Sequence, residues 1–204
     1  MAFVINAMNV NDGFQKCYDL FSQPRCVESA DTRNGVVLRL REPVVVEYAN
    51  PLERVLFNLN RDANPFFHLF ESIWMLAGRN DVEFVQQFNT NIRSYSDDSQ
   101  TFKGAYGNGW RRHFETDQIR AALKELHARP ETRRCVIGMW DPSSDLEDSS
   151  WSKDVPCNTQ IYFKIRGPSL MMTVCNRSND MLWGLFGANA VHFSFLHEHM
   201  ARAL

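Results

Sequence analysis

Residues 161–174 carry the pattern that most restricts the fold, because apolar and polar side chains alternate in two runs on either side of Gly167-Pro168. Alternation with a period of two is typical of a strand with one buried face, and a Gly-Pro pair between two such runs indicates a turn. The sequence therefore predicts two paired strands. Their apolar faces would consist of Ile161, Phe163 and Ile165 in the first strand and Leu170, Met172 and Val174 in the second.

Other segments alternate between helical and strand-like patterns without strict repetition. We expect helices up to about Arg25, after a cap at Asn11 or Asp12, and from Asn64-Pro65 to Gly78. Further expected elements are a strand region from Gly35 broken by Pro43, a loop over 89–109, a helix between Asp117 and Pro130, a buried strand at 135–140, and a helix from about Asn189 to Leu204. This mixture predicts an α+β fold with a mixed β-sheet packed against helices.

Length and composition agree with one folded domain over residues 1–204. Hydrophobic residues make up 44% of the chain, and the formal net charge is only −2, from 22 basic and 24 acidic side chains. A balance this neutral argues against nucleic acid as the main partner, and the longest apolar runs fall far below the roughly 20 residues that span a membrane. Five cysteines without a CxxC pair, and no secretory signal at the N-terminus, predict a reducing, cytoplasmic location.

Cys157 is the cysteine whose context favours reactivity. It follows Pro156 at the start of a predicted strand, and Arg177 comes 20 residues later, after the second strand. If the two strands pair as a hairpin, the guanidinium returns near the thiol and favours the nucleophilic thiolate. The alternative is a structural cysteine at the start of a strand, which is the commoner situation.

Two further groups are candidates for an active site: a pair of adjacent arginines and a glutamate on an aromatic helix. Arg133 and Arg134 are adjacent, and paired guanidinium groups suit a phosphate dianion, although a solvated helix end is an equally good interpretation. Glu71 lies on an aromatic helix between Phe70 and Trp74, where burial would suit general acid–base work. His197 and His199 lie two apart on a helix and so do not share a face, and we expect no metal site.

These residues stand in six blocks whose order resembles the thymidylate synthase family and its sister enzymes, the deoxypyrimidine-monophosphate hydroxymethylases. The blocks are FFHLFESIWMLAG (66–78), GAYGNGWR (104–111), ETRRCVIGMWDP (131–142), PCNTQIYF (156–163), NRSND (176–180) and WGLFGANAVHFSFLHEHMA (183–201). They cover nearly the whole chain. The resemblance implies a thymidylate synthase-like α+β fold in which one sheet face forms a homodimer interface.

The resemblance also implies roles in binding a nucleotide. Cys157 would add to C6 of the pyrimidine and activate C5, while Arg177 and Ser178 would hold the phosphate. Asn189 would read the base, since an amide both donates and accepts hydrogen bonds. The remaining phosphate ligands would be Arg133 and Arg134, reaching across the dimer interface, and Arg33 near the N-terminus.

For the one-carbon donor, the resemblance implies 5,10-methylenetetrahydrofolate as cosubstrate. Glu71 would order water and relay protons, Tyr106 would help to remove the C5 proton, and Asp180 would contact the pterin. Trp74 is counted with Glu71 and Asp180 among the folate-binding residues.

Two reactions remain open, together with a third possibility. Asn189 favours dUMP as substrate and its methylation to dTMP, because the cytosine-specific hydroxymethylases are expected to carry Asp at this position. Asn158 replaces the usual His, the loop 91–98 lacks a Trp, and the Gly184-to-Asn189 loop is one residue longer. These changes fit addition of water and a hydroxymethyl product from dUMP or dCMP. A catalytically silent nucleotide- or RNA-binding protein is the third possibility.

The same comparison suggests that the chain is short for its family. The family's sugar-binding His and Tyr and its folate-closing C-terminus would lie beyond Leu204, so we expect a C-terminally incomplete domain. The match is most similar to compact phage versions, which would place the protein in the host cytoplasm.

Overall fold

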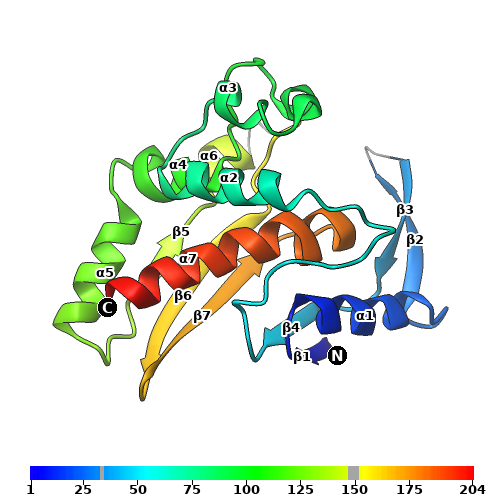
Figure 1. Ribbon diagram of the computed structural model, residues 1–204, viewed down its shortest axis with the longest axis horizontal. Coiled ribbons are helices and arrows are strands. Elements are labelled where there is room, and N and C mark those ends of the chain that lie inside the picture. The colour runs from blue at the N-terminus through cyan, green and yellow to red at the C-terminus, as the bar shows by residue number, and fades with distance from the viewer. Residues whose placement is uncertain (33–34, 147–151) are drawn as a thin grey trace. The chain divides into compact units, whose positions relative to one another are not determined.

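The computed structural model describes residues 1–32, 35–146 and 152–204. These residues form two compact units, one made of Met1–Ala63 with Met181–Ala190 and the other of Asn64–Asp180 with Val191–Leu204. Both units contain helices and strands, which confirms the α+β class (Figure 1). A single domain over residues 1–204 stays a prediction. Among the described residues, no helix is long and apolar enough to cross a membrane.

The first unit combines two small sheets with one long helix. β1 pairs with β4 in parallel, and β2 pairs with β3 in antiparallel orientation. Pro43 separates β3 from β4 as predicted, while the strands β1 and β2 have no counterpart in the sequence analysis. The elements are β1 (Phe3–Ala7), α1 (Val10–Phe21), β2 (Val27–Thr32), β3 (Gly35–Leu40), β4 (Val44–Tyr48) and the π-helical segment η3 (Met181–Ala188).

Helix α1 and segment η3 hold the core of this unit together. Phe186 is fully buried and meets the ring of Phe14 edge-on, with 5.9 Å between centroids. A Cβ atom at Gly13 would lie 2.8 Å from the Phe186 ring, so the close approach of α1 requires glycine there. Residues 181–190 are thus part of the N-terminal unit, although they are far from it in sequence.

The second unit holds a three-stranded sheet and most of the helices. Asn64 caps α2 by accepting a hydrogen bond from the Phe67 N–H, and Asp117 caps α5 in the same way. The elements are α2 (Pro65–Leu76), α3 (Val82–Val85), η1 (Thr90–Tyr95), α4 (Tyr106–Asn108), η2 (Gly109–His113), α5 (Gln118–Ala128), β5 (Val136–Gly138), α6 (Pro142–Asp145), β6 (Asn158–Arg166), β7 (Ser169–Asn176) and α7 (Asn189–Ala203), whose first two residues belong to the other unit.

The predicted hairpin is confirmed. β6 and β7 pair in antiparallel orientation around a turn in which Gly167 has φ +56°, and Ile161 is paired with Val174, Phe163 with Met172 and Ile165 with Leu170. The six predicted apolar side chains therefore share one sheet face. β5 pairs with the other edge of β6. The imidazole of His197 on α7 donates to the Leu170 carbonyl oxygen on β7 at 2.7 Å.

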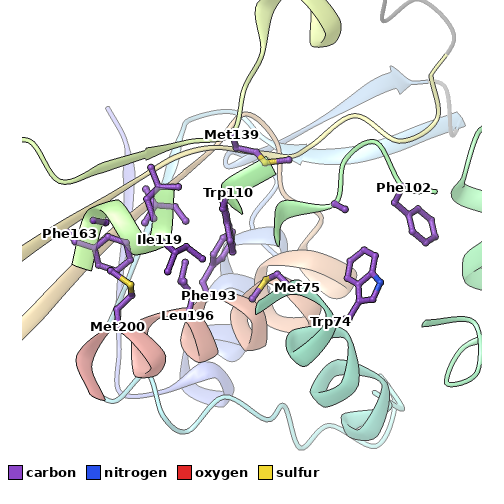
Figure 2. Close-up of a cluster of buried hydrophobic side chains, with 14 of the residues drawn as sticks. Trp74, Met75, Phe102, Trp110, Ile119, Met139, Phe163, Phe193, Leu196 and Met200 are labelled. Atoms are coloured by element: carbon purple, nitrogen blue, oxygen red, sulfur yellow. The ribbon is translucent and has the colours of Figure 1, made fainter. Parts of the chain in front are cut away.

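A single apolar cluster joins this sheet to the helices of its unit. Figure 2 shows Trp74 and Phe102 at one end of the cluster and Phe163 and Met200 at the other, with Trp110 and Phe193 between them. Trp110 is completely buried. Burial on this scale supplies most of the favourable free energy of folding.

Two expectations about the fold need correction. Parallel and antiparallel pairing both occur, but the described strands form three separate sheets in place of one mixed sheet. The region 89–109 is not simply a loop, because it contains η1 and the start of the turn formed by α4 and η2. Its many Gly, Ser and Asn residues lower helix propensity, and the buried side chains Ile92 and Phe102 stabilise the short helical turns nonetheless.

Candidate active site

Cys157 lies directly before β6, at the point where the chain enters the sheet. Its side chain is half-buried, and it is not in a disulfide. Burial raises the pKa of Cys17 and of Cys135 to about 11, so those two thiols stay protonated in the core. Of these three cysteines, only Cys157 combines partial exposure with a cationic neighbour.

Arg177 returns to the cysteine segment, as the hairpin register requires. Its backbone N–H donates to the Cys157 carbonyl oxygen at 2.9 Å, and its guanidinium donates to the carbonyl oxygens of Pro156 and Val155 at 2.9 and 3.0 Å. The guanidinium also stacks over the Trp140 ring, 5.7 Å from its centroid. The guanidinium is thus fixed by two adjacent carbonyl oxygens of the segment directly before Cys157 and by the ring of Trp140.

A second set of contacts fixes the segment that leads to Cys157. Asp97 accepts hydrogen bonds from the Ser152 hydroxyl and the Lys153 N–H, and Asp154 accepts one from the Gly104 N–H at 2.9 Å. Burial raises the pKa of Asp154 to about 6, and the Gly104 hydrogen bond only partly offsets that effect. A Cβ at Gly104 would lie 2.6 Å from the Asp154 carboxylate, so the approach of the two segments depends on glycine.

Tyr106 lies at the junction of three helices. Its ring stacks on Phe193 of α7, with 5.7 Å between centroids and 14° between planes. The next residue, Gly107, packs against the last turn of α2 so closely that a Cβ would lie 1.7 Å from the Met75 carbonyl oxygen. The segment 104–107 therefore connects the Cys157 loop, through Asp154, to α2 and α7.

Glu71 projects from α2 toward His192 on α7. The Glu71 Oε2 and His192 Nε2 atoms are 2.9 Å apart, and the two side chains are 17% and 8% exposed. This distance is that of an ion pair, but the two groups are not aligned as in a hydrogen bond, and neither atom has a hydrogen-bond partner among the described residues. Two acid–base groups are therefore held in contact inside the second unit.

Asn158 anchors the chain at the start of β6, directly after Cys157. It is completely buried, and its amide donates to the Cys175 carbonyl oxygen at 3.0 Å where the register of β6 and β7 shifts. Its Oδ1 atom has no hydrogen-bond partner in the described part of the chain. The residue that replaces the family's usual His is thus anchored in the sheet by its amide N–H.

The predicted site residues fall into several groups. Cys157, Arg177, Glu71 and Tyr106 all belong to the second unit and are linked by the contacts above. Ser178 and Asp180 follow β7 and are exposed in the same unit, whereas Asn189 is buried in the first unit.

The arginines predicted to bind phosphate are placed differently. Arg133 and Arg134 are exposed beside Cys135, which pairs with Phe163, and so lie about 20 Å along the strand from Cys157. They do not join the Cys157 site of their own chain. Arg33 lies outside the described residues.

Trp74 belongs to the core. Its side chain is only 6% exposed, its ring packs edge-on against Phe102, and its indole N–H donates to the Asp81 carbonyl oxygen at 3.1 Å. These contacts account for the residue structurally and give no support to a folate contact. The alternating aromatic pattern around Glu71 does not distinguish a core face from a ligand-facing one.

Sequence reasoning missed Asp154 and His192. Asp154 lies in a Ser- and Asp-rich segment that reads as an ordinary polar loop. The available signal for His192 is a histidine three positions after Asn189, on the helix that Asn189 opens. In the described ranges, no group of three or more His, Cys, Asp or Glu side chains is arranged to hold a metal ion.

Comparison with known proteins gives a consistent result. A family model described as thymidylate synthase matches residues 61–204. A deoxyuridylate hydroxymethyltransferase of Pseudomonas phage M6 is 55% identical over 175 residues, covering 85% of this chain and 49% of that protein. A protein of the same name from Bacillus phage SP01 is 40% identical, over 80% of this chain and 45% of that protein. Another from Delftia phage PhiW-14 is 32% identical, over 91% of this chain and 54% of that protein. The chain thus spans about half the length of these relatives.

Proposed function

Because the chain belongs to the thymidylate synthase family, we propose that the protein transfers a one-carbon unit to C5 of dUMP with Cys157 as nucleophile. The observation that carries the proposal is the position of Cys157 at the entry to β6, with the Arg177 guanidinium bound to the two residues before it. Hydroxymethylation is the outcome that we favour, since the phage relatives are named deoxyuridylate hydroxymethyltransferases.

The chain's own residues supply the activation of the pyrimidine. The Cys157 sulfur forms a bond to C6, and the C5=C6 electron pair moves toward the C4 carbonyl oxygen, which leaves C5 nucleophilic. Glu71 provides a proton to that oxygen through water and takes it back when C5 attacks the one-carbon unit and the C4 carbonyl re-forms. Arg177 and Ser178 bind the phosphate at the end of β7, and Asn189 reads the base.

The one-carbon unit would come from 5,10-methylenetetrahydrofolate when that cosubstrate is bound. Asp180 is exposed after β7 and carries the carboxylate that suits the amines of a pterin. Tyr106 lies on the segment next to the cysteine loop, where a phenol can assist removal of the C5 proton. Because only a reduced cysteine can act, a cytoplasmic location is part of the proposal.

A homodimer is also part of the proposal. The β5–β7 sheet face opposite the core exposes Val136, Tyr162 and Met171, which are 42%, 39% and 47% exposed. Val136 and Tyr162 are paired in the register, so the apolar surface is continuous across β5 and β6. Arg133 precedes this face, beyond reach of its own Cys157, and a partner subunit would bring the twin arginines to the other site.

The methyl product dTMP is the second candidate, and Asn189 and the family's name support it. The reaction is identified by incubating the protein with dUMP and methylenetetrahydrofolate and weighing the nucleotide product. A hydroxymethyl product together with tetrahydrofolate supports the favoured reaction, and a methyl product together with dihydrofolate supports the second. Unchanged dUMP and unchanged dCMP in parallel reactions would contradict both and leave a silent nucleotide-binding protein.

A further inference from the structure

We infer that His192 is a positioning residue that holds the Glu71 carboxylate for its role in the reaction. This inference rests on the proposed function, in which Glu71 exchanges a proton with the pyrimidine. The observation behind it is the buried contact of 2.9 Å between His192 Nε2 and Glu71 Oε2, made between α7 and α2.

The contact differs from an ordinary structural pair. Buried polar atoms nearly always have hydrogen-bond partners, and an unsatisfied one costs about 1–3 kcal/mol. Here both atoms are buried, close together and misaligned for a hydrogen bond, with no other partner in the described ranges. Catalytic hydrogen bonds are often poorly aligned before substrate binds and tighten in the complex. The geometry is therefore that of a pair that completes its alignment when Glu71 engages a ligand.

The helices on either side leave the pair little freedom. Phe193, the next residue to His192, stacks on Tyr106, and Met75, one turn after Glu71, touches Gly107. Both anchors come from the same short segment, so α2 and α7 are held relative to each other by a common element. A small shift of the Tyr106 segment on substrate binding would change the angle between the imidazole and the carboxylate without breaking their contact.

The chemistry explains why histidine suits this position. An imidazole N–H donates to a carboxylate, and the same nitrogen accepts from a protonated carboxyl, so once aligned the pair can form one hydrogen bond in both protonation states of Glu71. Oε2 is occupied by His192 in either state, which leaves Oε1 to face water and the substrate. His192 thus acts through Glu71 and has no contact of its own with the reacting atoms.

A double-mutant cycle tests this assignment. Glu71→Gln and His192→Phe are each expected to lower kcat about 100-fold or more, with the KM for dUMP changed less than about threefold. The effects are similar because both substitutions disrupt the same Glu71–His192 pair. The double variant should then be within about threefold of the worse single variant. His192→Gln, which keeps an N–H donor, should recover at least about a tenth of the wild-type kcat.

A matched control is available on the same helix. His197→Phe makes the same ring substitution but removes only the hydrogen bond to the Leu170 carbonyl oxygen, so it should lower the melting temperature and leave kcat within about threefold. The inference is wrong if His192→Phe behaves like this control, if the effects of the two site variants multiply, or if His192→Gln is as inactive as His192→Phe.

A readout without catalysis separates this inference from the proposed function. If the pair is coupled, the melting-temperature losses of Glu71→Gln and His192→Phe should sum to clearly more than the loss in the double variant. Additive losses contradict the pair. If the losses are coupled but the wild-type protein converts neither dUMP nor dCMP, the contact between Glu71 and His192 is supported. The proposed function is then wrong, and so is the role given to His192.

Discussion

Replacing Asp154 with Asn should remove a pH-dependent destabilisation of about 3 kcal/mol from the folded protein. Burial raises the pKa of Asp154 from 3.8 to about 6, and about two pKa units correspond to about 3 kcal/mol. Below about pH 3 the carboxyl is protonated in both the folded and the unfolded chain and contributes almost nothing. Between about pH 4 and pH 6 the unfolded chain ionises this carboxyl while the folded state keeps it protonated, so stability falls over that window. Nearly the full cost is present at pH 7, where the folded state buries the charge.

The difference between the two proteins isolates this effect. Asn keeps a side-chain oxygen for the Gly104 N–H, and carboxyls with lowered pKa values, such as Asp141 and Glu125, change stability equally in both proteins. Urea unfolding of wild type and Asp154→Asn at pH 4 and pH 7 gives the four free energies of unfolding. The variant should gain about 2.5 kcal/mol relative to wild type over this range. A relative change below about 1 kcal/mol would refute the account of a buried, titrating Asp154.

Gly107→Ala places a methyl group 1.7 Å from the Met75 carbonyl oxygen, so it should lower the free energy of unfolding in urea by about 3 kcal/mol or more. A loss below about 1 kcal/mol would contradict the packing of α4 on α2. Arg177→Lys cannot reach both carbonyl oxygens that the guanidinium binds and should lower kcat/KM for dUMP at least about tenfold, whereas unchanged kinetics would exclude the proposed role. Trp74→Phe removes the hydrogen bond to the Asp81 carbonyl oxygen and should cost about 1–2 kcal/mol without changing the KM for folate, and a raised KM would instead support a folate contact.

Local patterns predicted the parts of the fold that are determined locally. Alternation over 161–174 gave the hairpin and its buried face, and capping by Asn64 and Asp117 gave two helix starts. The strands β1 and β2 were not predicted. β1 pairs in parallel with β4, which lies far along the chain, and the burial pattern of β2 does not alternate. Short helical turns in 89–109 depend on tertiary burial of a few side chains, which propensity does not show.

The same distinction holds for the candidate site. Cys157 and Arg177 could be brought together in advance because hairpin register links them. His192 and Glu71 are more than 100 residues apart, and their contact follows from how α2 and α7 pack on the Tyr106 segment. Trp74 is buried in the core, and its folate contact stays a prediction, since an aromatic helix face has the same composition in both situations.

Release of tritium from C5-labelled dUMP in the presence of methylenetetrahydrofolate tests the role of Cys157 most directly. Breaking the C5–H bond requires the sulfur at C6, whichever product forms afterwards. Wild type should release the label, and Cys157→Ser should release at least about a thousandfold less at an unchanged melting temperature. Cys175→Ser is the matched control, because it replaces a half-buried thiol in the neighbouring strand, and it should resemble wild type. Equal release by wild type and Cys157→Ser would contradict the account.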